Sequence, residues 1–164
     1  MRLLPCAVIL LLLTGVALGQ EQPAKDNPPP APTSNISGMY TFLRDGEFVQ
    51  IDVDGGKVDG FISRYGDSDA DRGAFLDHMI KTGTLEGKKM HFDTRSVHGV
   101  SYEFTGTVER GEGKAPGDEA YYVLKGTLKQ VTEDAEHKST TKERAVEFKA
   151  FPADAGMDPP KKKQ

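Results

Sequence analysis

The chain has 164 residues, a formal charge of −4 at pH 7 and no tryptophan. This length supports one domain with a modest core, and the mildly acidic charge gives no reason to expect nucleic acid or anionic lipid as a partner. The only cysteine, Cys6, lies in a segment that we expect to be removed, which excludes disulfides and thiolate metal sites from the mature protein.

The first 19 residues have the layout of a secretory signal peptide. A positive charge at Arg2 precedes an apolar run over residues 7–18, and the small residues Ala17 and Gly19 predict cleavage after Gly19. The run is shorter than the ~20 residues that a membrane-spanning helix needs. We therefore expect a secreted or periplasmic protein with no membrane insertion after cleavage.

Two segments flanking the expected domain cannot contribute to a core. Residues 20–35 contain five prolines and no large apolar side chain, which predicts an extended, disordered tether. Residues 152–164 end in a proline- and lysine-rich stretch and are expected to be a disordered tail. One folded domain is predicted between them, over residues 36–151.

Residues 36–65 predict three short strands joined by tight turns. Apolar residues occupy alternate positions on both sides of the Gly55-Gly56 pair: Val49, Ile51, Val53, Val58 and Ile62. Period-two alternation is typical of a half-buried strand, and consecutive glycines can adopt the positive φ angles of a hairpin turn. A β-meander is therefore expected to begin here.

The alternation stops after residue 65, and a helix of about three turns is predicted. Apolar residues recur there at i, i+4 spacing: Phe75, Leu76, Met79 and Ile80. Ser68 followed by Asp71 resembles a capping box, and Gly83 suits a helix end.

Further strands are predicted at residues 84–86, 89–94, 102–108, 122–128 and 146–148. The total is about eight sequential strands with mostly short loops, which predicts an all-β, antiparallel up-and-down meander with one helix between strands 3 and 4. Closing the sheet would remove its unpaired edges, so a closed barrel is favoured over a sandwich.

The opening Ser37-Gly38-Met39-Tyr40-Thr41, followed by Gly46, Ile51, Gly56 and Gly60, resembles the avidin and lipocalin (calycin) families, whose first strand carries Gly-x-Trp. Tyr40 stands at the tryptophan position. The resemblance implies a calycin-like barrel, and the biotin-binding polar positions of the avidin family correspond to Phe42 and Glu47. Because no tryptophan is available to wall the ligand, biotin is not expected.

A calcium site is one hypothesis for the acidic residues after the third strand. Asp67, Asp69 and Asp71 copy the first half of an EF-hand loop. However, Arg72 replaces the required glycine and His78 replaces the closing glutamate. Helix capping explains the acidic cluster better.

A second metal hypothesis involves His91, Asp93 and His98, since two imidazoles and a carboxylate can hold a divalent ion. Alternation with Met90 and Phe92 instead predicts a solvent-facing polar stripe. The sequence also lacks a nucleophile elbow, a phosphate-binding glycine loop and a mature thiol. We therefore expect no metal or cofactor and favour a non-enzymatic role.

The candidate ligand-binding residues are Arg64, Tyr102 and Tyr122. Arg64 shares the inner face of its strand with Ile62, and the two tyrosines share the apolar faces of theirs, so all three are expected in the mouth of a barrel. In the alternative interpretation, Arg64 reaches solvent and the tyrosines fill the core. The sequence thus predicts a barrel that binds a small, anionic or amphiphilic molecule, or a scaffold module with a filled core.

Overall fold

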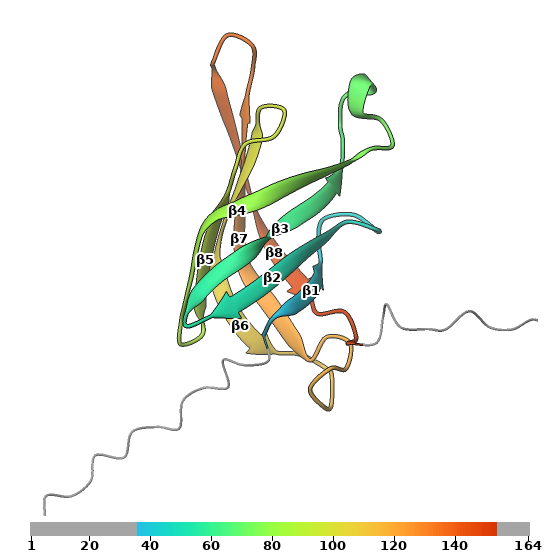
Figure 1. Cartoon of the computed structure of the whole chain (residues 1–164), viewed down its shortest axis with the longest axis vertical. Coiled ribbons are helices and arrows are strands. Elements are labelled where there is room, and N and C mark those ends of the chain that lie inside the picture. The colour runs from blue at the N-terminus through green and yellow to red at the C-terminus, as the bar shows by residue number, and fades with distance from the viewer. Residues whose placement is uncertain (1–35, 154–164) are drawn as a thin grey trace, which may run out of the picture.

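The computed structural model describes residues 36–153. Its eight strands follow one another around a curled sheet, and each pairs antiparallel with the next (Figure 1). The strands are β1 (Gly38–Thr41), β2 (Phe48–Asp54), β3 (Lys57–Tyr65), β4 (Phe75–Glu86), β5 (Lys89–Thr94), β6 (Val100–Arg110), β7 (Tyr122–Glu133) and β8 (Ser139–Lys149). The expected signal peptide and tether, and the tail beyond residue 153, lie outside the described residues. None of the helical segments in this range has the length and hydrophobicity of a membrane span.

The predicted all-β meander is confirmed. In β2 and β3, Val49 pairs with Ile62 and Ile51 with Gly60, so the alternating apolar residues meet across the two strands on the buried side of the sheet. Such cross-strand contacts between buried side chains are the unit of sheet stabilisation.

The predicted helix is wrong. Residues 75–86 form β4, and the one helical element among the described residues is the short 3-10 turn η2 (Asp69–Asp71). In β4, His78 and Ile80 point inward, whereas Phe75 and Met79 are 49% and 47% exposed. In a strand, residues four apart also share a face, so Phe75 and Met79 lie on the outer face of β4 and Leu76 and Ile80 on the inner face, and the i, i+4 spacing fits a strand as well as a helix. The true alternation of β4 was hidden because the polar side chain of His78 occupies an inner position.

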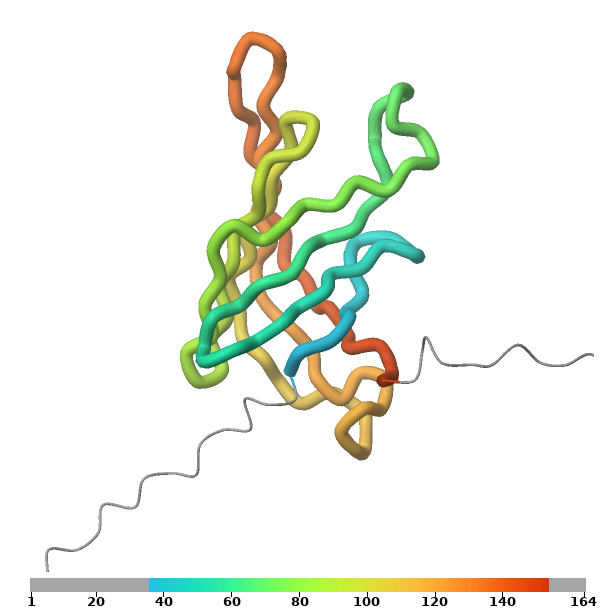
Figure 2. Tube along the Cα trace, in the orientation of Figure 1, coloured from blue at the N-terminus to red at the C-terminus, as the bar shows by residue number. Residues whose placement is uncertain are grey.

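The first and last strands meet over a short distance. A bridge joins Tyr40 to Ala150, and Phe151 N donates to Met39 O at 2.8 Å. Lys149 N also donates to the Thr41 hydroxyl oxygen at 2.9 Å. The pairing between β1 and β8 involves far fewer residues than the ladders between β6, β7 and β8. The sheet therefore forms a curled half-barrel (Figure 2).

Large side chains fill the middle of the curled sheet. Ring centres lie 5.3 Å apart for Phe92 and Phe104, 5.8 Å for Phe104 and Phe148, and 5.2 Å for Phe148 and Phe42. Because the strands alternate in direction, the loops 42–47, 66–74, 95–99 and 134–138 all emerge at one end, which we call the mouth end. The polar groups described next lie there.

Candidate functional site

A cavity of about 240 Å³ lies at the mouth end. Its lining comes from the β1–β2 loop, the end of β3 and the loop after it, and strands β6, β7 and β8: Leu43, Arg44, Glu47, Arg64, Asp67, Tyr102, Gln130 and Arg144. Charged and polar side chains dominate this list, in contrast to the apolar interior beneath it.

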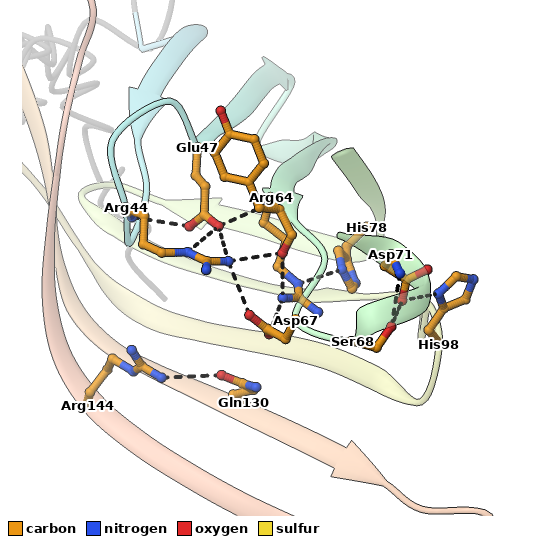
Figure 3. A network of polar contacts seen from close by, with 11 residues as sticks. Arg44, Glu47, Arg64, Asp67, Ser68, Asp71, His78, His98, Gln130 and Arg144 are labelled. Carbon is orange, nitrogen blue, oxygen red and sulfur yellow. Dashed lines mark hydrogen bonds and ion pairs between the residues drawn. The ribbon is translucent and has the colours of Figure 1, made fainter. Parts of the chain in front are cut away.

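Arg64 forms the centre of this polar group, as Figure 3 shows. Its side chain is only 4% exposed. The Nε atom donates to His78 Nε2 at 3.2 Å, and Nη1 donates to Tyr65 O at 3.0 Å and to Asp67 Oδ2 at 2.5 Å. The guanidinium carbon also lies 5.9 Å from the centre of the Tyr102 ring. Arg64 therefore points inward at the mouth and does not reach solvent as the alternative interpretation required.

Glu47 fixes the β1–β2 loop against the end of β3. Its carboxylate, 2% exposed, accepts from Arg44 N at 3.2 Å, from Arg44 Nε at 2.8 Å and from Tyr65 N at 3.0 Å. Arg44 Nη2 in turn donates to Tyr65 O at 3.0 Å. Buried charge is costly unless it is paired and hydrogen-bonded, and Glu47 satisfies both conditions.

The opposite wall of the cavity carries Arg144. Its Nη2 donates to Gln130 Oε1 at 3.3 Å. Its Nε is buried and has no hydrogen-bond partner among the described residues. Buried donors without partners are uncommon in folded proteins. The Nε of Arg144 is therefore a donor that a ligand could use.

The site carries a net positive charge. His78 accepts from Arg64, and burial, followed by the nearby guanidinium, lowers the pKa of His78 to about 4, so the imidazole is neutral at pH 7. Burial raises the pKa of Tyr102 to about 12, which keeps its phenol protonated. Three guanidinium groups and two carboxylates then line the cavity, which leaves a formal charge of +1.

Tyr122 does not join this group. It lies at the first position of β7, at the end of the sheet opposite the mouth. There it packs against Tyr121, with ring centres 4.7 Å apart, and lines a separate cavity of about 390 Å³ together with Tyr40. The structure thus brings Arg64 and Tyr102 together and places Tyr122 elsewhere.

Sequence reasoning missed two residues that the same argument could have found. Arg144 precedes Val146 by two positions, and Gln130 follows Leu128 by two. Each therefore shares the inner face of its strand's apolar residues, as Arg64 does. Glu47, named above through the avidin resemblance, lies in the loop just before β2. Arg44 and Asp67 lie in loops, where alternation carries no information.

The residues weighed as metal ligands have other partners. The Ser68 hydroxyl oxygen accepts from Asp71 N at 3.2 Å, and the Asp71 carboxylate lies 3.0 Å from His98 Nδ1. The imidazole of His91 instead contacts Thr105. Over residues 36–153, no group of three or more histidine, cysteine, aspartate or glutamate side chains is arranged to hold a metal ion.

Comparisons with known proteins show a likeness in fold alone. No family model and no curated protein matches the chain. The structure of apo bradavidin2 (form B) matches with a TM-score of 0.50 and 10% identity, over 70% of this chain and 94% of that one. The structure of the bradavidin2–biotin complex matches with a TM-score of 0.48 and 12% identity, over 70% of this chain and 95% of that one. The fold therefore has a weak likeness to avidin-like β-barrels, which confirms the resemblance of the opening strands.

Proposed function

We propose that the protein is a non-enzymatic binding protein that holds one small molecule in the mouth-end cavity. The observation that carries this proposal is the buried Arg64, which lines a polar cavity together with Tyr102 and Arg144. Burying a guanidinium beside an open cavity costs desolvation energy that a purely structural site could avoid with apolar side chains. Polar groups that converge on a concave site are typical of ligand recognition.

The fold supports the same class of function only by analogy. One structural neighbour, bradavidin2, has been solved with biotin. Fold likeness at 10% identity does not transfer a ligand. The present cavity is lined by charged groups, and the chain has no tryptophan, so we do not extend biotin binding to it.

The ligand must be small. Cavities that hold drug-sized ligands usually measure about 300–1,000 Å³. The volume here, about 240 Å³, lies below that range. Beneath the cavity, buried aromatic rings pack against one another in the hydrophobic core.

Native mass spectrometry of the exported protein tests the proposal. We expect a retained small-molecule mass in the wild type. This mass should be lost in Arg144→Gln, which removes the buried Nε donor that has no partner among the described residues. Tyr122→Phe is the matched control, because that ring lies at the other end of the sheet, and it should keep the mass. The absence of added mass and of any thermal shift with small-molecule probes would overturn the proposal.

A second candidate function is a protein-interaction module with a filled core. The packed interior favours it, and so does the exposure of Phe75 and Met79 on the outer face of β4. Both side chains lie on the same face of one strand, where a partner could contact them together. Retention of a macromolecule by the wild type but not by Met79→Ser, with no small-molecule mass, would favour this alternative.

We also propose that the protein acts outside the cytoplasm and that its sheet closes into a barrel. The signal layout supports export, and we expect the intact mass of the secreted product to be that of a chain beginning at Gln20. The Tyr40–Ala150 bridge supports closure because it begins a β1–β8 ladder. Amide exchange at Phe151 as fast as in an unstructured peptide would contradict closure.

A further inference from the structure

The Asp67 carboxylate bridges two arginines at the rim of the mouth-end cavity. Its Oδ2 accepts from Arg64 Nη1 and its Oδ1 accepts from Arg44 Nη2 at 3.2 Å. Asp67 follows β3 in the loop 66–74, and Figure 3 shows its contacts with both arginines. The chain itself therefore shows that the two guanidinium groups can share one planar carboxylate.

The two carboxylates of the site differ in how firmly they are held. Glu47 is buried and accepts from two backbone N–H groups as well as from Arg44. Asp67 is 60% exposed, and its contacts are ion pairs with Arg44 and Arg64. The Arg44–Asp67 pair is exposed on both sides, and such pairs contribute little to stability because solvent screens them and side-chain entropy opposes them. In the Arg64–Asp67 pair only the carboxylate is exposed, so a ligand that replaces Asp67 must itself supply a partner for the buried guanidinium. Glu47 is thus a fixed element of the fold, and Asp67 can be displaced.

Displacement of Asp67 would leave the cavity strongly cationic. Three guanidinium groups would then face only the Glu47 carboxylate, which is already satisfied by Arg44 and Tyr65. Arg64 would regain the Nη1 donor now given to Asp67, and the buried Nε of Arg144 across the cavity has no partner among residues 36–153. Guanidinium groups recognise carboxylates through parallel or bridging hydrogen bonds.

We propose that the ligand of the mouth-end cavity is a compact carboxylate, and that its carboxylate takes the position now held by that of Asp67. This inference rests on the proposed binding function and names its ligand class. Asp67 acts as an internal competitor that neutralises Arg64 until the ligand enters. The Tyr102 ring beside Arg64 gives the ligand an apolar surface.

Isothermal titration calorimetry with sodium benzoate tests this inference, with neutral benzamide and inorganic phosphate as comparison probes. We expect benzoate to bind the wild type and to bind Asp67→Asn about fivefold more tightly, because the Asp67 carboxylate no longer competes for Arg44 and Arg64. Benzamide should bind neither form. Asp69→Asn is the matched control, since its carboxylate lies on the same loop but pairs with the exposed Arg72, and its affinity should equal that of the wild type.

Each other outcome has a definite meaning. Equal or weaker benzoate binding by a folded Asp67→Asn protein would overturn displacement while leaving the binding function intact. Preference for phosphate would overturn the carboxylate class. If benzoate binds neither form but native mass spectrometry finds a retained ligand that is not a carboxylate, the inference fails and the proposed function stands. If no mass is retained and no probe binds, both fail.

Discussion

Arg64 and His78 form a buried pair in which a permanent cation donates to a neutral imidazole. The Arg64 Nε to His78 Nε2 distance is 3.2 Å, and the His78 ring packs edge-on against Tyr102 with centres 5.2 Å apart. Protonated histidine cannot accept this hydrogen bond and would face Arg64 as a like charge. The arginine at the centre of the candidate site therefore depends on an uncharged neighbour.

This pair predicts a loss of stability in acid. The pKa of His78 falls from 6.5 to about 4, mainly through burial and then through Arg64, with smaller opposing effects of the Val100 and Arg95 backbone and of Asp77. As the pH falls, the unfolded chain takes up this proton before the folded chain does. The contribution of His78 to the free energy of unfolding is therefore complete above pH 6.5 and is lost as the pH falls from 6.5 toward 4. The full loss is about 3 kcal/mol. Chemical denaturation at several pH values should show a steeper decline in the wild type than in His78→Gln.

His91→Gln is the control for this pH dependence. The His91 ring lies on the outer side of β5 and contacts Thr105. Its replacement should leave the slope of stability against pH unchanged. Parallel curves for the wild type and His78→Gln would show that His78 is not the group responsible.

The alternation of apolar and polar residues predicts which face of a strand a residue occupies, and in this fold the prediction holds for most strands but not for β4. It gave the correct meander because most inner positions are apolar. It failed in β4, where His78 is buried and a register shift between Ile80 and Thr82 interrupts the period. A local pattern cannot show that a polar residue is buried when its partner, Arg64, lies fourteen residues earlier.

Alternation also does not say at which end of the sheet a residue lies. Tyr102 and Tyr122 both face inward, but β6 begins at the mouth end and β7 begins at the opposite end, because the two strands are antiparallel. Tyr102 pairs with Gln130 near the end of β7, whereas Tyr122 pairs with Arg110. Combining inner-face parity with strand direction would have replaced Tyr122 by Gln130 in the predicted site.

Two glycines on inner strand positions should not tolerate a side chain. A Cβ on Gly60 would lie 2.0 Å from Gln50 O, at a φ of +130°, and one on Gly106 would lie 2.2 Å from Lys125 O. We expect Gly60→Val and Gly106→Val each to lower the free energy of unfolding by more than about 2 kcal/mol. Thermal and urea unfolding would measure this loss.

Gly87→Asn is the control for these substitutions. Gly87 has a φ of +61° and nothing within 4 Å of an added Cβ. Asparagine tolerates this left-handed conformation, so the change should stay within about 0.5 kcal/mol. Wild-type melting temperatures in both valine variants would contradict the observed strand register.

Ser68 should act as a cap and not as part of a calcium site. It precedes η2 and accepts from Asp71 N. Ser68→Ala should cost about 0.5–1 kcal/mol, at the lower end for a cap because the turn is short. Millimolar calcium should leave the melting temperature of wild type and variant unchanged. Bound calcium would instead add about 2.7 kcal/mol at a hundred times its dissociation constant, and a calcium-dependent rise abolished by Asp67→Asn/Asp69→Asn would contradict the capping role.

Glu47 should be the carboxylate on which the mouth end depends. Its oxygens accept from Arg44 N, Arg44 Nε and Tyr65 N. Glu47→Gln turns one acceptor into a donor that faces these donors, which should cost about 2–3 kcal/mol in chemical denaturation. Glu103→Gln removes a partly exposed partner of Lys129 at 3.3 Å and should cost no more than about 1 kcal/mol. Equal small losses in the two variants would show that the buried Glu47 network does not hold the β1–β2 loop against β3.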